Sequence, residues 1–421
     1  MIRAVAAFAL AAAIATSSPL AAQDYQPDCE RIAAFLAEAV DDGRVAGASA
    51  LVWKDGEERC FDAAGLADRE QDRPFERDTL VQFFSMTKPV TGVALMTLWE
   101  EGRFGLDDPL YWRLPEYENV EVLRGEADDG TAITSPPRRP ITIRDILRHT
   151  AGFTYGADGN PTNAADRIFE ELQPLDADKT LAEFSQAMAQ VPLLYEPGTH
   201  WNYSAGVDVQ ARLVEVLSGK DFTDYVHETV LGPLGMADTR WARSEEDLSR
   251  LARIYTVEGD GSFTPLPRDL WLEANFMDKP MTMGGSGLVG TVDDYLRFAR
   301  MLLGEGALGD VRILEPATVR LMASDHLDPA ITPDKRSWLV GKGSGGFGFD
   351  FFVRTGPPEN PEENRGSVGE FFWDGWPSML FWVDPRQDMA VIFATQKLPF
   401  DNSLHHDLRD AVYGADYGGG L

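Results

Sequence analysis

The chain has 421 residues, of which 44% are hydrophobic and 25% are charged, a composition that excludes disorder along the whole length. Lysine and arginine together number 38 and aspartate and glutamate 68, so the formal net charge is −30. Nucleic acids and anionic membranes attract basic surfaces, and this charge therefore argues against both as partners. The length is enough for one large globular unit or for two domains that share a core.

The first 22 residues have the pattern of an export signal. Arg3 supplies a positive start, residues 4–15 are apolar but too few to cross a bilayer, and small residues precede a cleavage site predicted after Ala22. No later stretch approaches twenty uninterrupted apolar residues. The sequence therefore predicts an exported protein, periplasmic or secreted, that is not inserted in a membrane.

Two elements are predicted directly after the signal. Residues 29–43 repeat apolar side chains at helical spacing and end at Gly43, which predicts a helix. Residues 46–68 read as two strands joined at Lys54-Asp55-Gly56, a strong hairpin pattern.

The only two cysteines fall in these first elements, at Cys29 and Cys60. In an exported protein they could form a disulfide, worth about 3–4 kcal/mol in the chain-entropy treatment. Two free buried thiols are the alternative. Apart from Arg59, no basic residue or histidine stands beside either cysteine, so neither is predicted to be a reactive thiol.

The middle of the chain, roughly residues 76–240, is predicted to be mostly helical. Residues 141–152 and 207–219 both show a period of 3.6 residues and end at a glycine. Residues 120–140 are polar and rich in proline, so a surface loop is predicted there.

The last part of the chain changes character. A helix is predicted from Thr291, which is expected to be its N-cap, and a final helix over residues 404–414. Between them lie four short aromatic and β-branched runs that predict strands, at residues 345–355, 367–373, 378–385 and 389–395.

Strands at both ends of the chain and helices between them predict an α/β (α+β) fold. The simplest arrangement is one mostly antiparallel sheet flanked by helices, with an inserted, mainly helical domain. The expected division assigns residues 23–75 and 290–421 to the sheet domain and residues 76–289 to the helical domain.

Ser85 stands three residues before Lys88, and Pro89 follows at once. A proline belongs in the first turn of a helix, so Ser85 is expected at the helix start, where backbone N–H groups are unpaired and partly positive. A serine hydroxyl needs a neighbouring base to become a nucleophile, and a desolvated lysine can help. On these residues alone, an N-capping serine with a solvated lysine remains the alternative.

This stretch resembles the nucleophile helix of the serine β-lactamase and penicillin-binding protein superfamily. The likeness is greatest to the class C β-lactamase-like esterases, also called family VIII esterases, and it extends over nearly the whole mature chain. The segments that carry it, in order, are "AGLADRE", "ITIRDILRHTAGF", "EPGTHWNYSAG", "LGPLGMADT", "GGSGLVGTVDDYLRFARMLL" and "FWVDPRQDMAVIFATQ". The resemblance implies a β-lactamase-like fold with Ser85 as nucleophile and Lys88 as a proton-transfer group.

The family's second motif matches Tyr203-Ser204-Ala205. The resemblance implies that Tyr203 is the second proton-transfer group. Two nearby positive charges, or a proton shared with Lys88, are expected to lower the pKa of its phenol so that a phenolate deprotonates Ser85. The third motif matches Trp373-Asp374-Gly375, followed by Trp376. By the same likeness, the backbone N–H groups of Ser85 and Trp376 would form an oxyanion hole.

The third motif differs from the Lys-Thr/Ser-Gly of β-lactamases and resembles the Trp-Gly-Gly-like variants of the esterases, from which Asp374 departs; this bears on the substrate. β-Lactamases hold the substrate carboxylate with a cation there, which Trp373 cannot provide and which Asp374 is expected to oppose. Ala205 also replaces an amide side chain that contacts acylamides in true β-lactamases. Both changes favour neutral esters. The expected substrate-binding residues are Trp201, Trp373, Asp374, Gly375 and Trp376, and four aromatic side chains are expected to wall an apolar pocket, namely Trp201, Phe372, Trp373 and Trp376.

The sequence thus predicts a carboxylesterase-type serine hydrolase that acts on a small-molecule ester. An amide hydrolase (β-lactamase or D-amino-acid peptidase) or an acyltransferase could use the same residues, and a non-catalytic binder of cell-wall peptides is the more distant alternative. No cofactor is expected, and no histidines have zinc-site spacing except His405 and His406, which are expected on the surface.

Two further segments could suggest other chemistry. Residues 284–288 miss the Gly-x-Ser-x-Gly spacing of an α/β-hydrolase and are expected to form a tight loop that opens the helix at Thr291. His149 is expected to be a structural residue at a helix end, where its side chain would satisfy backbone groups.

Overall fold

The computed structural model describes residues 25–156, 161–241, 245–267, 279–360, 362–414 and 417. The predicted export signal, residues 1–22, lies outside these ranges. Within them, none of the helices combines the length and the apolar character needed to span a bilayer.

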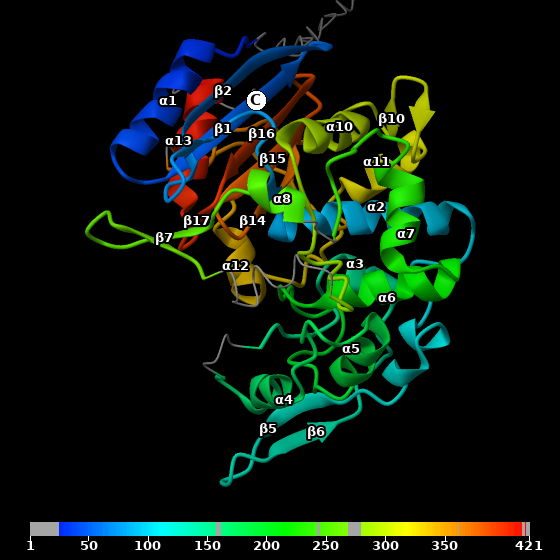
Figure 1. Cartoon of the computed structure of the whole chain (residues 1–421). Helices are drawn as coiled ribbons and strands as arrows, with labels where there is room; N and C mark the ends of the chain where they lie inside the picture. Colours follow the sequence, from blue (N-terminus) through cyan, green and yellow to red (C-terminus); the bar gives the residue numbers. More distant parts are fainter. Residues whose placement is uncertain are drawn as a thin grey trace, which may run out of the picture.

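An eight-stranded sheet forms the centre of the molecule, in the order β12-β13-β14-β15-β16-β1-β2-β3 (Figure 1). Neighbouring strands pair antiparallel throughout, and β1 joins β16 with Ala48 opposite Thr395. The two ends of the chain therefore meet in one sheet, which confirms the predicted fold class. The strands are β1 (Gly47–Lys54), β2 (Glu57–Asp68), β3 (Arg73–Pro74), β12 (Gly345–Phe347), β13 (Phe352–Arg354), β14 (Phe371–Gly375), β15 (Met379–Asp384) and β16 (Met389–Thr395).

Helices cover both faces of this sheet. Phe381 of β15 and Phe393 of β16 lie on opposite faces, because Phe393 pairs with Leu380, the neighbour of Phe381. The ring of Phe35 in α1 (Cys29–Asp41) lies 6.1 Å from that of Phe393, and the ring of Tyr295 in α10 (Val292–Leu303) lies 4.9 Å from that of Phe381. Since both faces are covered, every residue of β15 and β16 is buried.

The outer layer over α1 is completed by α13 (Asn402–Tyr413), which lies beside it in Figure 1. Cys29 at the start of α1 and Cys60 in β2 are joined by a disulfide, so this layer is tied to the sheet. The predicted hairpin between β1 and β2 is confirmed: Asp55 and Gly56 have φ of +52° and +82°, as a two-residue turn of this kind requires.

Below the sheet in Figure 1 lies the helical region, with a two-stranded hairpin at its far end. At its centre, α2 (Thr87–Glu100) is apolar around most of its circumference and packs against α6 (Gly206–Ser218). A helix that is apolar all round belongs in a core, which is where α2 lies. The other helices of the region are α3 (Ile143–Leu147), α4 (Ala164–Leu172), α5 (Leu181–Met188), α7 (Phe222–Val226) and α8 (Glu245–Arg250).

Two predictions in this region were wrong in part. The expected loop over residues 120–140 contains the hairpin of β5 (Val122–Glu126) and β6 (Ala132–Ser135), whose mostly exposed residues lack an alternating apolar pattern. The helix expected to run to Gly152 stops at Leu147, because His149 takes a left-handed φ of +55°.

Shorter elements complete the described chain. The strands are β4 (Val81–Gln82), β7 (Tyr255–Val257), β8 (Phe263–Pro265), β9 (Val289–Gly290), β10 (Ala307–Leu308), β11 (Val311–Arg312) and β17 (Lys397–Leu398). The helices are α11 (Pro316–Met322) and α12 (Ser337–Val340), with 3₁₀ turns at Phe84–Met86, Leu110–Trp112, Pro115–Tyr117 and Pro333–Arg336 and a π turn at His227–Leu231.

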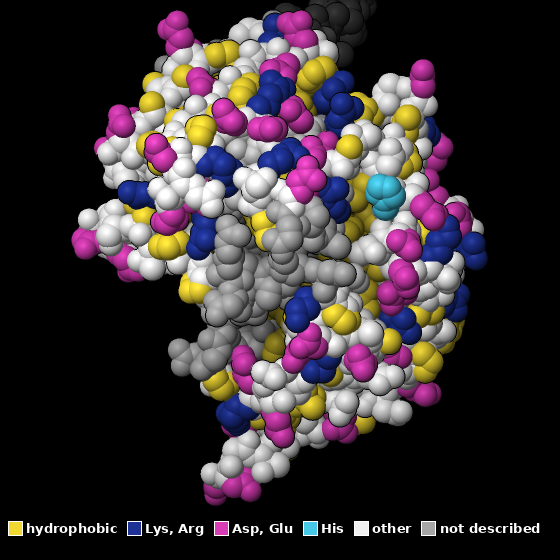
Figure 2. Space-filling view, viewed as in Figure 1, with side chains coloured by type: hydrophobic (Ala, Val, Ile, Leu, Met, Phe, Trp, Pro, Cys, Tyr) yellow, Lys and Arg dark blue, Asp and Glu magenta, His cyan; other side chains and the backbone are white. Residues whose placement is uncertain are grey.

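Charged side chains of both signs are interspersed over the face shown in Figure 2. Many of them pair locally; the Arg77 guanidinium, for example, bridges Glu58 at 2.6 Å and Asp293 at 2.8 Å. The excess of acidic residues is therefore spread among basic ones on this face, and it points to no particular partner.

Candidate active site

Ser85 lies in the 3₁₀ turn Phe84–Met86, immediately before α2. Pro89 is the third residue of α2, where its missing N–H removes no hydrogen bond within the helix. Phe84 has a φ of +46°, a left-handed conformation that is strained for a phenylalanine. The chain thus turns sharply just before Ser85 and leaves this residue partly exposed between buried neighbours.

Lys88, on the first turn of α2, is 1% exposed. Its Nζ lies 3.1 Å from Ser85 Oγ and donates a second hydrogen bond to the carbonyl of Gly285 at 2.7 Å. Burial lowers the pKa of Lys88 to about 8, although nearby carboxylates act in the opposite direction. Near neutral pH, part of the population therefore carries an uncharged amine beside the Ser85 hydroxyl.

Tyr203 reaches the same hydroxyl from the segment that precedes α6. Its Oη donates to Ser85 Oγ at 2.7 Å. The expectation of a lowered phenol pKa was wrong: burial raises the pKa of Tyr203 above its usual value, and the Asp374 carboxylate adds to the effect. Tyr203 is therefore a neutral phenol that donates a proton to the hydrogen bond with Ser85.

The loop at residues 284–288 fixes the Lys88 side chain. Thr91 Oγ1 donates to the Gly284 carbonyl at 2.7 Å, and the Leu288 N–H donates to Thr87 Oγ1 at 3.1 Å. A Cβ at Gly284 would lie 2.6 Å from that of Ala211, so only a glycine brings this loop so close to the helices. The segment was expected to open the next helix, and Thr291 does cap α10 by accepting from the Asp294 N–H. Its contact with Lys88 was not foreseen.

Two buried carboxylates, which the sequence analysis missed, flank Lys88. Asp208 in α6 accepts from the Gly285 N–H at 3.0 Å, so it holds the same peptide whose carbonyl holds Lys88. Asp350 is fully buried and accepts from Gln210 Nε2 at 3.1 Å. Both carboxylates raise the pKa of Lys88 and partly offset its burial. An aspartate in the first turn of a helix resembles a surface residue in sequence, which is why Asp208 gave no signal.

The end of β14 lies against the backbone that leads to Ser85. A Cβ at Gly375 would lie 2.5 Å from the carbonyl oxygen of Phe83, and the ring of Trp376 lies 5.7 Å from that of Phe84. No hydrogen-bond partner is found in the described part of the chain for the backbone N–H of Ser85 or of Trp376. Both expected oxyanion-hole donors are therefore unpaired and belong to adjacent segments.

The expected wall of aromatic side chains was largely wrong. Trp201, Phe372 and Trp373 are 4%, 1% and 0% exposed, and they pack in the core. Trp373 lies behind Tyr203, with ring centres 5.5 Å apart. Phe372, its neighbour on β14, faces the other side of the sheet, where the Arg409 guanidinium lies 4.8 Å from its ring. Only Trp376, at 42%, is exposed as expected among the four.

Two residues near the site gave no signal in the sequence. Trp338 of α12 is 48% exposed, and its ring stacks on that of Tyr203 at 5.0 Å. Lys342 forms an ion pair with Asp374. The expectation that Asp374 presents a bare, repulsive carboxylate was therefore wrong, because a buried ammonium compensates its charge.

The histidines also differ from expectation. His149 is buried 5.0 Å from the Tyr203 ring, and its Nδ1 lies 3.4 Å from Ser204 Oγ, so its side chain meets a hydroxyl and not the backbone. Burial lowers its pKa well below the usual value. His405 was expected at the surface but is 2% exposed, with Nε2 2.9 Å from the carbonyl of Ser378.

Within the described ranges, no group of three or more His, Cys, Asp or Glu side chains could hold a metal ion.

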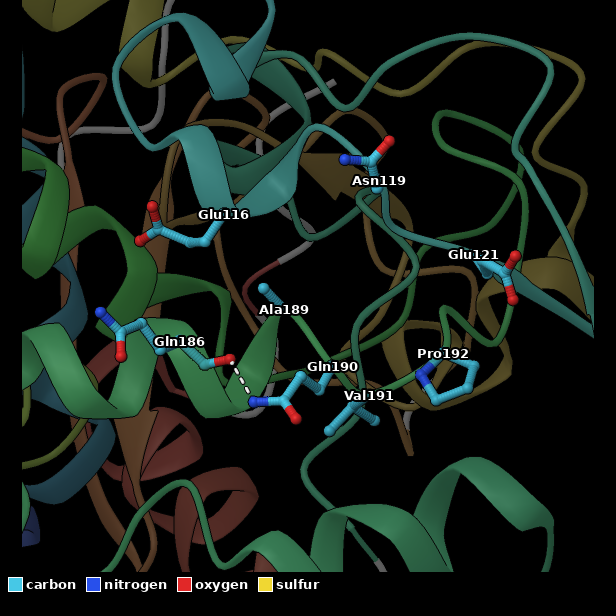
Figure 3. A pocket seen from close by; sticks show the side chains of 8 residues that line it. All are labelled: Glu116, Asn119, Glu121, Gln186, Ala189, Gln190, Val191 and Pro192. Carbon is cyan, nitrogen blue, oxygen red and sulfur yellow. Dashed lines mark hydrogen bonds between the residues drawn. The ribbon is translucent and has the colours of Figure 1, made fainter.

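Away from this site, the described residues line two further cavities. One of about 450 Å³ opens in the helical region, and in Figure 3 Gln190 points back to the carbonyl of Gln186 across one side of it. The other, of about 680 Å³, lies beside β2 and is lined in part by Phe61 and Arg77. Neither is lined by Ser85, Lys88 or Tyr203, so the candidate site is distinct from both.

Known proteins resemble this chain along most of its length. An uncharacterized protein of Mycobacterium tuberculosis is 34% identical over 90% of this chain and 92% of its own. Esterase EstB of Burkholderia gladioli is 29% identical over 91% and 94%. Among solved structures, EstCE1, described as a hydrolase with promiscuous acyltransferase activity, superposes with a TM-score of 0.73 at 27% identity and covers 91% of this chain and 98% of its own.

The sequence pattern of the Beta-lactamase family matches residues 32–414, nearly the whole described chain. This match spans the turn that holds Ser85, the segment with Tyr203 and the strand that ends at Gly375. The protein belongs to the Beta-lactamase family, whose members similar to it include esterases.

Proposed function

We propose that the protein is a carboxylesterase that forms an acyl-enzyme on Ser85, with Lys88 and Tyr203 as proton-transfer groups. The observation that carries the proposal is the pair of contacts at Ser85 Oγ, 3.1 Å from Lys88 Nζ and 2.7 Å from Tyr203 Oη. A lysine whose pKa is about 8 can act as a base near neutral pH. Similarity to Esterase EstB supports ester hydrolysis as the reaction.

In the proposed acylation step, the neutral amine of Lys88 takes the proton of the Ser85 hydroxyl as Oγ attacks the ester carbonyl carbon. The carbonyl oxygen becomes an oxyanion, for which the unpaired N–H groups of Ser85 and Trp376 are the available donors. Loss of one such donor is expected to cost about 3–4 kcal/mol of transition-state stabilisation. The strained turn at Phe84, directly before Ser85 and α2, supports this role, because the Ser85 side chain and its N–H lie at the start of that helix.

When the tetrahedral intermediate collapses, the bond to the leaving alcohol breaks and the alkoxide needs a proton. Tyr203 is the candidate donor, since its phenol is neutral and already donates toward Ser85 Oγ. The proton on Lys88 then restores the phenol of Tyr203, so the acyl-enzyme again has a neutral amine. Water repeats the sequence on the acyl-enzyme and releases the carboxylic acid.

Transfer of the acyl group to an alcohol in place of water is the second candidate. It uses the same acyl-enzyme, and EstCE1 is described as having promiscuous acyltransferase activity. Adding methanol or butanol to the ester assay distinguishes the two: an acyltransferase forms the new ester in preference to the free acid, whereas a hydrolase forms mostly acid.

Covalent labelling tests the nucleophile directly. A fluorophosphonate probe should lose fluoride and add the mass of one phosphonyl group to the intact protein. Peptide mapping should place this group on Ser85. Ser85→Ala should lose both labelling and turnover of 4-nitrophenyl butyrate. If Ser85→Ala keeps its turnover, the proposal is wrong, and a wild-type protein that takes no label favours the non-catalytic binder.

We also propose that the protein is exported and that its mature chain starts after Ala22, on the pattern of residues 1–22. Sequencing the N-terminus of protein recovered from the periplasm or the culture medium tests this. A chain that still begins at Met1 in a cytosolic fraction would contradict it.

A further inference from the structure

The segment of residues 333–342 covers one side of Tyr203 and contains α12. The ring of Trp338 is parallel to that of Tyr203 within 9°, at 5.0 Å, and stacks also on Trp201 at 5.6 Å. The backbone supports this placement, because the Trp201 N–H donates to the Lys335 carbonyl at 3.1 Å. Since 48% of Trp338 is exposed, part of its indole is free to contact a substrate beside Tyr203.

Lys342, just after α12, attaches this segment to the sheet through its ion pair with Asp374. The two residues are 6% and 5% exposed. The ammonium also lies 4.7 Å from the centre of the Trp338 ring and 5.0 Å from that of Phe400. Separating such a pair is costly, because each charge would be left without water and without a partner. Asp374 is itself held by the ladder between β14 and β15, opposite Leu380.

The pair lies next to the proposed oxyanion hole. Asp374 is followed directly by Gly375, which contacts the backbone before Ser85, and by Trp376 with its unpaired N–H. A carboxylate alone at this place would oppose the negative charge that develops on the carbonyl oxygen. An ammonium alone would attract an anionic substrate. Together the two buried groups add no net charge beside the oxyanion hole.

We propose that the Lys342–Asp374 pair is a specificity-determining element, which makes the site select uncharged acyl groups over anionic ones. This inference rests on the proposed esterase function. An acyl group that ends in a carboxylate could pair with the Lys342 ammonium only by displacing Asp374, which already pairs with it. An uncharged acyl group meets no such competition and can pack on the exposed part of Trp338.

Two esters with the same leaving group test the proposal. 4-Nitrophenyl butyrate and mono-4-nitrophenyl succinate have acyl chains of the same length, but the succinate ends in a carboxylate. Asp374→Asn leaves Lys342 charged without a counter-ion, so the ratio of kcat/KM for succinate to that for butyrate should rise about tenfold or more. Lys342→Met leaves Asp374 unpaired and should lower both values and shift the ratio the other way.

The double variant K342M/D374N removes both charges and should return the ratio to within about threefold of wild type. Lys342→Arg keeps the positive charge and is the matched control, with a ratio close to that of wild type. Should Lys342→Met fail to fold, Asp374→Asn alone decides the question, because asparagine preserves the size of the side chain.

A ratio that stays within threefold of wild type in Asp374→Asn would overturn the role of the pair. A wild-type protein that is inactive on both esters would instead overturn the proposed esterase function. If the wild type is active and Asp374→Asn does not change the ratio of kcat/KM values, only the role of the Lys342–Asp374 pair is wrong, and the esterase function is unaffected.

Discussion

The amine nitrogen of Lys88 lies 4.7 Å from the centre of the Tyr203 ring, over its face, and both residues contact the Ser85 hydroxyl. Burial raises the pKa of the Tyr203 phenol, so the phenolate is unfavourable here even with the amine of Lys88 nearby. The two residues therefore have separate roles in the proposed mechanism. Lys88 has the lowered pKa of a base, and Tyr203 keeps its proton as a donor.

The pH dependence of esterase activity should follow Lys88. The amine must be unprotonated to accept the Ser85 proton, and burial lowers its pKa from 10.5 to about 8. We expect kcat/KM for 4-nitrophenyl butyrate to rise about tenfold per pH unit at low pH and to level off above about pH 8. Lys88→Ala should lose about two to three orders of magnitude of activity. A wild-type profile that is flat from pH 6 to 9 would contradict Lys88 as the base.

Tyr203→Phe should separate proton donation to the leaving group from the rising, low-pH part of that profile. Removing the phenol takes away the donor to the leaving alcohol, with an expected loss of about two to three orders of magnitude in kcat. The inflection near pH 8 should persist, since it belongs to Lys88. Esters with better leaving groups need less protonation and should lose less activity, so a series of substituted phenyl esters tests the assignment. Equal losses for phenyl and 4-nitrophenyl esters would argue for a structural role only.

Asp208→Asn should move the same inflection to lower pH. The carboxylate raises the pKa of Lys88, and asparagine removes the charge while its side-chain oxygen can still accept from the Gly285 N–H. More of the Lys88 amine is then neutral at a given pH, so the rising part of the kcat/KM profile moves to lower pH. Asp350→Asn should shift it in the same direction by less, because the effect of Asp350 on the pKa of Lys88 is weaker. An unchanged midpoint in both variants would mean that these carboxylates are not charged near neutral pH.

The sequence was sufficient to predict that Lys88 meets Ser85, because the two residues stand in one local pattern. Pro89 predicts a helix start, and the spacing of three residues places Lys88 on the same side as Ser85. Tyr203 is distant in sequence, and only the resemblance to the family connected it to this helix. The antiparallel sheet followed from the alternating and aromatic runs at the two ends of the chain.

What could not be predicted depends on contacts between distant segments. Trp338 lies on a four-residue helix that has no periodic pattern of its own, and Lys342 follows that helix. Trp338 nevertheless covers Tyr203, and Lys342 compensates the charge of Asp374. Trp373 looked like a pocket wall, but strand β14 is covered on both faces, so its aromatic residues pack inward. The raised pKa of Tyr203 likewise depends on burial, which local sequence does not determine.

The disulfide between Cys29 and Cys60 offers a test that is independent of the chemistry at Ser85. The two cysteines are 31 positions apart, and in the chain-entropy treatment a loop of that length stabilises the folded state by about 3–4 kcal/mol. The double variant Cys29→Ser/Cys60→Ser should lose about that much free energy of unfolding, measured by urea denaturation against the oxidised wild type. Its kcat/KM should stay within about twofold, because neither cysteine contacts the candidate site. Wild-type protein treated with a reductant is the matched control and should unfold at the same urea concentration as the double variant; a midpoint that reduction does not move would show that the bond adds no stability.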